Sequence, residues 1–561
     1  ANRFRKPNLL IISKAQITSR KTNRRAPRAA GLHIPIWVPH TEQDYFRSVE
    51  AHWQTRTIDN NYDVRQDRFS LLESVPVAGT LKDYETYRFG ASTFTVLPTP
   101  GHTVGSLSLL VEMDGRRVAF TGDLIAGAGK LWSLAATQWT YNGAEGVPAS
   151  IVSLLEVKRS QPDLILPSHG TPMDEPAPAI DLLVERLNEL LQHRQHNLRL
   201  FQFLEKPYVP ITPHLLWNRT SVSNSYVLLS RSGKAMIIDY GYDFVVGAAT
   251  STDRASRRPW LVSLDALKRD FGVSEIDVVI ATHYHDDHVA GFNLLRSVEG
   301  TEVWAAETFA DVLQNPKQYD LPCLWHDPIV VDRVLPVNRS VRWEEYEITC
   351  WEQPGHTLYA VAIGFVADDR RVLAIGDQYQ GEKADQWNYV YANRFRMGDY
   401  RRSADLYQEL QPDIVVAGHS DPVWVTPDYL DGLTTRGAIL ERLHEALLPL
   451  ETFDLGAEGA GARIQPYQVQ ARSGETVGFQ VEVRNPFPEK QPAVIEMIVP
   501  RGWTVIEPRV RTEIEGRGVQ TVEFRVIPIA EQPTRRARVA VDVTVGNQRL
   551  GELAEALVTI I

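Results

Sequence analysis

Apolar residues recur at helical spacing in two long stretches that resemble each other. The stretches are "AIDLLVERLNELLQHR" (179–194) and "LTTRGAILERLHEALLPL" (433–450), and their spacing predicts an amphipathic helix in each. Each predicted helix follows a short apolar run that ends beside a histidine and a glycine, "DLILPSHG" (163–170) and "DIVVAGHS" (413–420). Such runs indicate short buried strands. The same strand–helix unit is therefore expected twice.

A second pair of stretches supports a tandem duplication. "PGHTVGSLSLLVEMDGRRVAFTGD" (100–123) parallels "PGHTLYAVAIGFVADDRRVLAIGD" (354–377). Equivalent histidines and aspartates lie 254 or 250 residues apart, which is too long for a solenoid repeat and indicates tandem domains. The matched pairs are His102 with His356, Asp123 with Asp377, and His169 with His419.

The pattern changes after residue 453. "DLGAEGAGA" (454–462) is a small-residue linker, and the following runs alternate in polarity and are rich in β-branched residues. Turn-rich breaks separate these runs, which predicts an all-β, immunoglobulin-like sandwich. We therefore expect one copy over 1–203, a second copy over 204–453, and the β-sandwich as an accessory domain over 463–561.

Composition narrows the class of protein. The 561 residues are too many for one core, and the formal net charge of −11 argues against a nucleic-acid partner. Two cysteines form neither a disulfide framework nor a zinc knuckle. No apolar run approaches the roughly 18 residues that span a bilayer, and residues 1–30 hold no signal peptide. We expect a small-molecule substrate and a cytoplasmic location. Secretion is the alternative location if a signal peptide was removed. An oligomeric state is also compatible with the sequence.

The stretch "THYHDDH" (282–288) follows the apolar run "EIDVVIAT" and sits where that predicted strand ends. Residues two apart face the same way in an extended segment, so His283 and His285 can grip one ion together. Asp287 and His288 turn with the chain and can serve a second ion. A single strand histidine is usually a core residue, but four ligand-type side chains within six residues are hard to place in a core. Imidazole and carboxylate suit zinc, with iron and manganese as alternatives.

Three later residues extend this set. His356, Asp377 and His419 each stand beside glycine at a predicted strand end, in "PGHT", "IGD" and "AGH". Glycine lets the backbone turn sharply and leaves the neighbouring side chain exposed. Each residue alone could belong to an ordinary loop, but together they complete a set of seven candidate ligands.

In its order, this set resembles the signature of the metallo-β-lactamase superfamily of αββα hydrolases. The resemblance covers about residues 207–450, and Asp239 in "AMIIDYG" matches the early aspartate of the family. It implies an α/β fold, a duplicated αββα sandwich, with two divalent metal ions, foremost zinc, about 3.5–4 Å apart around a hydroxide. It also implies catalytic roles for Asp287 and Asp377. The implied ligands are His283, His285 and His356 for one metal, Asp287, His288 and His419 for the other, and Asp377 as the bridge.

The implied function is a dinuclear metal-dependent hydrolase that attacks an ester-like bond with a metal-bridging hydroxide. The site is more similar to glyoxalase II thioesterases and lactonases than to the iron flavoproteins, which carry glutamate where this chain has His285. We therefore rank thioesters and lactones before β-lactams. A phosphodiester or sulfate-ester hydrolase is the alternative, and a non-enzymatic scaffold is the alternative of another class.

Other residues near the motifs carry weaker signals. "QWNYVYANRFR" (386–396) is either a wall or lid for an apolar or anionic substrate, or an aromatic packing segment. Tyr284 and Tyr359 stand next to candidate ligands, where they either stabilise an oxyanion or pack. His326 is expected to be structural.

The first copy is expected to be incomplete. It keeps three candidate ligands, but "KAQITSRK" (14–21) stands where the histidine-rich motif belongs, and residues 1–32 contain no His, Asp or Glu. Counterparts of the strands over about 207–270 are also missing. We expect this copy to be catalytically silent and to dock against the second. The basic stretch 1–30 is interpreted as a solvated arm, with a transit peptide and a non-native start as alternatives.

Overall fold

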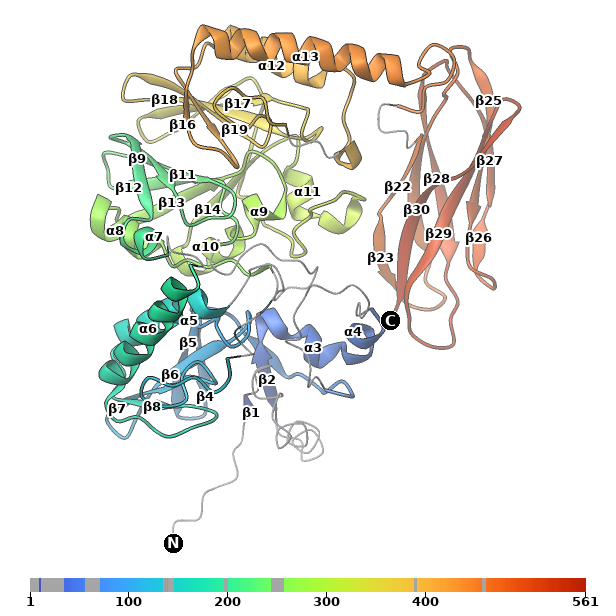
Figure 1. Cartoon of the computed structure of the whole chain (residues 1–561). Coiled ribbons are helices and arrows are strands. Elements are labelled where there is room, and N and C mark those ends of the chain that lie inside the picture. The colour runs from blue at the N-terminus through green and yellow to red at the C-terminus, as the bar shows by residue number, and fades with distance from the viewer. Residues whose placement is uncertain are drawn as a thin grey trace.

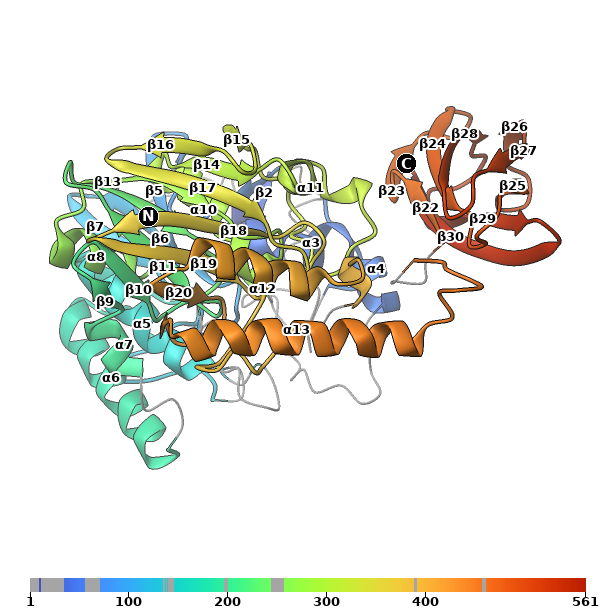
Figure 2. The same ribbon diagram turned by 90° about the horizontal axis from the view of Figure 1, so that it is seen from above.

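The computed structural model describes residues 10–11, 35–55, 71–134, 137, 139, 146–195, 200–243, 257–387, 391–456 and 461–561. Its two related αβ units lie one against the other, and an all-β unit stands to their side (Figures 1 and 2). The stretch "KAQITSRK" and most of the basic segment 1–30 lie outside the described residues.

The second copy contains a seven-stranded sheet in the order β15-β14-β13-β12-β11-β10-β9. Neighbours from β12 to β15 are parallel and those from β9 to β12 are antiparallel. The strands are β9 (Tyr208–Thr212), β10 (Leu215–Asn218), β11 (Ser225–Leu229), β12 (Lys234–Ile238), β13 (Glu275–Ile280), β14 (Glu302–Ala306) and β15 (Arg333–Leu335).

A second, six-stranded sheet lies in the order β16-β17-β18-β19-β20-β21. Residues of β19 alternate between two cores: Ala374 belongs to the core shared with the first sheet, while Leu373 and Ile375 pack under the helices α12 (Asp399–Leu410) and α13 (Pro427–Leu447). This alternation follows from the period of two along a strand. The strands are β16 (Ser340–Trp343), β17 (Tyr346–Glu352), β18 (Val361–Ala367), β19 (Arg370–Gly376), β20 (Ile414–Ala417) and β21 (Val423–Trp424).

Helices cover the outer face of each sheet. In Figure 1, α12 and α13 lie over the second sheet, and α8 and α10 lie beside the first sheet, on the side away from the second. The layers are therefore helix, sheet, sheet and helix, which confirms the expected αββα architecture. The shorter helices of this copy are α8 (Leu264–Phe271), α9 (Asp286–Val289), α10 (Phe292–Glu299), α11 (Ala310–Gln314), η4 (Pro316–Gln318) and η5 (Tyr391–Asn393).

The first copy repeats part of this plan. Its parallel sheet β1-β2-β3 takes the place of β13 to β15, and its sheet β4-β5-β6-β7-β8 takes the place of β16 to β20. The described residues of this copy include no counterpart of β9 to β12. The strands are β1 (Leu10–Ile11), β2 (Ile36–Pro39), β3 (Gly79–Leu81), β4 (Thr86–Phe89), β5 (Ser92–Pro98), β6 (Leu107–Met113), β7 (Arg116–Phe120) and β8 (Leu164–Leu166).

Both predicted long helices are present. The helix expected over 179–194 corresponds to α6, which ends at His193, and the one expected over 433–450 corresponds to α13, which ends at Leu447. The helices of the first copy are η1 (His40–Glu42), α3 (Asp44–Arg47), α4 (Val49–Thr55), α5 (Gly146–Arg159) and α6 (Pro176–His193), with α7 (Leu200–Glu205) at the junction.

The two copies are joined by a buried arginine. The Arg258 guanidinium of the second copy bonds both carboxylate oxygens of Asp83 in the first, at 2.7 and 3.0 Å. It also donates to the carbonyl oxygens of Val104 and Ser106, at 2.5 and 2.9 Å. Trp260 packs into the core of the first copy. These contacts agree with the expected docking of the first copy against the second.

The C-terminal unit has two sheets around one core, ordered β22-β24-β28-β26 and β23-β30-β29-β25-β27. The immunoglobulin-like class and the domain boundaries stay predictions. No helix in the described part of the chain is long and apolar enough to cross a membrane. The strands are β22 (Ala462–Gln465), β23 (Gln468–Ala471), β24 (Val477–Arg484), β25 (Gln491–Ile498), β26 (Thr504–Ile506), β27 (Arg509–Ile514), β28 (Val519–Ile527), β29 (Thr534–Val545) and β30 (Gln548–Ile560).

Candidate metal centre

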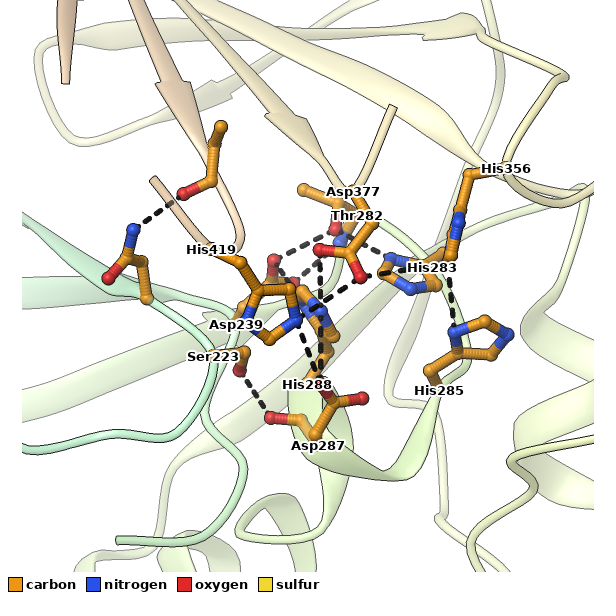
Figure 3. A network of polar contacts seen from close by, with 12 residues as sticks. Ser223, Asp239, Thr282, His283, His285, Asp287, His288, His356, Asp377 and His419 are labelled. Atoms are coloured by element: carbon orange, nitrogen blue, oxygen red, sulfur yellow. Dashed lines mark hydrogen bonds and ion pairs between the residues drawn. The ribbon is translucent and has the colours of Figure 1, made fainter. Parts of the chain in front are cut away.

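The seven candidate ligands of the second copy meet between its two sheets (Figure 3). Four of them come from the loop after β13 and from α9, and the others follow β17, β19 and β20. They form two groups, and within each group the ligand atoms lie within 4.8 Å of one another. The groups are His283, His285 and His356, and Asp287, His288, Asp377 and His419.

The first group is a buried cluster of imidazoles. The Nδ1 atom of His285 lies 3.1 Å from the Nε2 atom of His356. Burial and the neighbouring imidazoles lower the pKa of His283 well below its usual value, and burial with His356 lowers the pKa of His285 to about 3. The rings of His283 and His285 are therefore neutral at physiological pH, which is the form that binds a metal ion.

The second group mixes carboxylates with imidazoles. The Nε2 atom of His419 lies 3.1 Å from Asp287 Oδ2 and 3.2 Å from Asp377 Oδ2. Burial alone raises the pKa of both carboxyls, but His288 and His419 lower it below the usual aspartate value. Both carboxylates are therefore ionised and able to accept a cation.

Asp377 stands between the two groups. Its Oδ1 atom is 3.2 Å from His288 Nε2, and its Oδ2 atom is 3.6 Å from His356 Nε2. One carboxylate thus reaches a member of each group, which is the placement that a bridging ligand requires.

Buried polar atoms without hydrogen-bond partners indicate that the two groups can bind divalent cations. The Nε2 atoms of His283 and His285 are buried and have no hydrogen-bond partner in the described part of the chain. Buried polar atoms are normally paired, because leaving them unpaired costs free energy. Imidazole nitrogens and carboxylate oxygens converging in sets of three and four are the donor set that zinc prefers. The residues present therefore fit two divalent ions.

Asp239 is not in either group, but its carboxylate contacts residues that position the candidate ligands. At the end of β12, its carboxylate accepts hydrogen bonds from the amide and hydroxyl of Thr282, at 2.7 and 2.8 Å. Its Oδ2 atom also lies 2.9 Å from His288 Nδ1, and the Thr282 hydroxyl lies 3.1 Å from His283 Nδ1. Such contacts orient imidazoles toward a metal.

Replacing Asp239 with asparagine is expected to weaken zinc binding about 10- to 100-fold, because the amide gives His288 and Thr282 a weaker and more ambiguous partner. Competition with a chromophoric chelator measures this affinity. Asp277→Asn is the matched control, because Asp277 also accepts from two side chains, those of Lys234 and Trp343, but touches no candidate ligand. Equal zinc affinity in the wild type and the Asp239 variant would contradict the role.

Two glycines let the ligands approach each other. A Cβ atom on Gly418 would lie 2.0 Å from Asp377 Oδ1 and 2.8 Å from His288 Cε1. Gly376 has a φ of +51°, and a Cβ atom there would lie 2.5 Å from the hydroxyl oxygen of Thr282. The motifs "IGD" and "AGH" therefore need glycine for both space and backbone conformation.

Tyr284 and Tyr359 each form a hydrogen bond with a side chain of the segment "QWNYVYANRFR". The Tyr284 hydroxyl donates to Asn393 Oδ1 at 2.9 Å, and Asn393 Nδ2 donates to the His356 carbonyl at 3.2 Å. The Tyr359 hydroxyl accepts from Arg394 at 2.7 Å. The described part of "QWNYVYANRFR" thus lies against the ligand loops, and Tyr284 has a structural partner. These contacts favour the packing interpretation for Tyr284.

One residue of the motif escaped prediction. Asp286 is buried, accepts from the Tyr242 hydroxyl at 2.7 Å, and forms an ion pair with Arg257 at 2.5 Å. Its amide donates to the Cys323 carbonyl at 2.9 Å. Asp286 therefore anchors the start of α9, which carries two candidate ligands. Its place inside "THYHDDH" was the only available signal, because its partners are remote in sequence.

The three matching residues of the first copy also lie together. His169 Nδ1 is 2.8 Å from Asp123 Oδ1, and His102 Nε2 is 3.7 Å from Asp123 Oδ2. Trp132 stacks on His169 with ring centroids 4.4 Å apart. Among the described residues, both groups able to hold a metal belong to the second copy.

Comparison with known proteins agrees with this geometry. The profile of the metallo-beta-lactamase superfamily matches residues 24–169 and 219–419. The chain belongs to the metallo-β-lactamase superfamily, and both copies share in the match.

Two curated relatives carry the same name. The hydroxyacylglutathione hydrolase of Bartonella henselae is 30% identical over 152 residues, which are 25% of this chain and 54% of that protein. The hydroxyacylglutathione hydrolase of Bartonella quintana is 27% identical over 194 residues, 33% of this chain and 69% of that protein. The chain therefore spans about half the length of the first relative.

Solved metallo-β-lactamases are similar at lower identity. One from Novosphingobium pentaromativorans is 19% identical, with 43% of this chain and 91% of that chain covered and a TM-score of 0.33. A subclass B3 metallo-β-lactamase of Bradyrhizobium japonicum is 16% identical, with 43% and 94% covered and the same TM-score of 0.33.

Proposed function

We propose that the second copy is a dinuclear metal-dependent hydrolase that cleaves an ester-like bond, with a thioester as the first choice of substrate. The observation that carries this proposal is the position of Asp377 between two groups of candidate ligands. The two relatives support the thioester, because an acylglutathione is a thioester by its name. The formal net charge of −11 favours a small-molecule substrate over a nucleic acid.

The proposed ligands divide as the geometry groups them. His283, His285 and His356 would hold one divalent ion, and Asp287, His288 and His419 would hold the other, with Asp377 shared. Zinc ions bound there would supply hydroxide at neutral pH and polarise the substrate carbonyl.

The chain's own residues prepare this chemistry. The two aspartates offset the charge of the cations, and Asp239 fixes the orientation of His288. Asp287 is partly exposed, whereas His283 and His356 are buried, so Asp287 is the carboxylate best placed to orient an incoming water or relay its proton. Hydrolysis adds the oxygen of water to the acyl carbon and breaks the carbon–sulfur bond. The thiolate that leaves takes up a proton, so a carboxylic acid and a thiol are the products.

A substrate panel tests the proposed bond. The zinc-loaded full chain is given an S-acylglutathione, a lactone, a β-lactam and a phosphodiester, and kcat/KM is measured for each. We expect the thioester to give the highest value. Turnover of the phosphodiester alone would contradict the proposal, and so would an equal rate from the metal-free chain.

A further inference from the structure

The segment "RRPW" (257–260) of the second copy contacts both the first copy and the loop that carries candidate metal ligands. Arg258 is bonded to Asp83 of the first copy at 2.7 and 3.0 Å, and Trp260 packs into the core of that copy. Arg257 instead donates to the Asp286 carboxylate of the second copy at 2.5 Å. Because Asp286 is part of "THYHDDH", this short segment joins the junction of the copies to the histidine-rich motif.

Proline at position 259 favours this division of contacts. The residue before a proline prefers an extended backbone, and neighbouring side chains of an extended segment point to opposite sides. The partners of the two arginines agree, since Arg258 reaches the first copy and Arg257 reaches the second. Arg258 is 1% exposed and is bonded to a carboxylate and to two carbonyl groups of the first copy. The first copy therefore fixes the place from which Arg257 extends.

The ion pair between Arg257 and Asp286 holds the start of α9. The Asp286 side chain is 6% exposed, and its carbonyl accepts the amide of Ala290 at 2.9 Å. Asp287 and His288 follow Asp286 in the same helical turn, so a displacement of Asp286 moves both candidate ligands. A buried carboxylate that loses its cation is strongly destabilised, which favours such a displacement.

Tyr240 ties the other end of α9 to the same segment. Its hydroxyl donates to the Trp260 carbonyl at 3.1 Å, and its amide donates to the His288 carbonyl at 2.7 Å. Its own carbonyl accepts the amide of Gly291 at 2.9 Å. A Cβ atom on Gly291 would lie 2.3 Å from Tyr240 Cδ1, so the ring packs closely on the residues after α9. Both ends of α9 thus depend on the segment "RRPW".

We propose that Arg257 is a positioning residue of the metal centre, and that the first copy acts on this centre by holding Arg257 in place through Arg258. The inference rests on the proposed function, because the residues that it positions, Asp287 and His288, are ligands only in that proposal. The first copy, which lacks the histidine-rich motif, would then order α9 before a metal ion binds. Ligands held in place beforehand lose less conformational freedom on binding, so the affinity for this ion depends on the first copy.

Hydrogen–deuterium exchange of the metal-free full chain, followed by mass spectrometry, tests the link without zinc or turnover. Arg257→Gln removes the cation beside α9 from a partly exposed position. Asp83→Asn, in the first copy, keeps one acceptor for Arg258 and so loosens the contact without removing it. Amides in residues 286–291 should exchange at least about fivefold faster in both variants, because their hydrogen bonds open more often. Amides of α13 should exchange as in the wild type.

Stepwise zinc titration against a chromophoric chelator gives the second readout. Because α9 carries ligands of one group only, both variants should weaken one zinc site about tenfold and leave the other within about twofold. A general loss of stability would weaken both sites together. Arg257→Lys keeps the positive charge and should return the weakened site to within about threefold of the wild type.

The matched control is Arg159→Gln. Arg159 also crosses the junction, to Asp265 at 2.5 Å, but both side chains are more than half exposed and the pair lies outside the segment "RRPW". This variant should keep wild-type exchange over 286–291 and both zinc affinities.

Several results would overturn the proposal. They are wild-type exchange over 286–291 in Arg257→Gln, faster exchange in Arg257→Gln with none in Asp83→Asn, an equal effect of Arg159→Gln, and equal weakening of both zinc sites. If the exchange result held but the chain bound no zinc, the proposed function would fail, whereas the ordering of α9 by the first copy would stand.

Discussion

Replacing Asp377 with asparagine is expected to lower kcat/KM for a thioester by about a thousandfold or more. The Asp377 carboxylate reaches both groups of candidate ligands, His288 at 3.2 Å and His356 at 3.6 Å. Asparagine has nearly the same shape but lacks the charge, and its amide nitrogen cannot act as a ligand. Loss of several kcal/mol of transition-state stabilisation corresponds to a factor of this size. Steady-state kinetics on the zinc-reconstituted variant measures it.

The duplication supplies the control for this experiment. Asp123 occupies the same motif position in the first copy and is similarly buried. We expect Asp123→Asn to leave kcat/KM within about twofold of the wild type, because the proposed catalytic centre lies in the second copy. Equal losses in the two variants would indicate an effect on folding or a working site in the first copy, and no loss in the Asp377 variant would contradict the bridging role.

Removing the Arg258 side chain is expected to destabilise the chain by about 3–5 kcal/mol. Arg258 is 1% exposed, and alanine would leave the Asp83 carboxylate and the carbonyl of Val104 without their donor. An unpaired buried charge costs far more than the loss of an exposed ion pair. Urea denaturation, monitored by tryptophan fluorescence, measures this loss of unfolding free energy. The midpoint of the unfolding transition of the two copies should move to a lower urea concentration.

The matched control is Arg371→Ala. Arg371 also pairs with an aspartate, Asp413, but its side chain is 56% exposed. Its removal should cost no more than about 1 kcal/mol. If both variants lost the same stability, Arg258 would not be the contact that holds the copies together.

The architecture of the second copy could be predicted because its signals are local. Helical spacing gave α6 and α13, and alternation within β19 places Leu373 and Ala374 on opposite faces of the sheet. The seven candidate ligands could also be predicted from the sequence, because each lies in a recognisable motif that follows an apolar run. In the structure these side chains lie in two groups, and their roles as metal ligands stay a prediction.

Features created by contacts between distant segments could not be predicted. Asp286 acquires its role from Arg257 and Tyr242, which no spacing rule links to it. The ion pair between Arg258 and Asp83 crosses the junction of the two copies, so it forms only after docking. Tyr284 stands in the motif itself, yet its hydroxyl turns to Asn393, because the neighbours of a side chain depend on packing.

Counting the metal ions bound to the purified full chain tests the central claim most directly. After zinc reconstitution and removal of excess ion, elemental analysis is expected to give two zinc ions per chain. The count should stay at two in Asp123→Asn and fall in Asp377→Asn, because Asp377 is one of the seven candidate ligands and Asp123 is not. A chain that binds no zinc, or one that binds four ions with two of them lost in Asp123→Asn, would contradict a single dinuclear centre in the second copy.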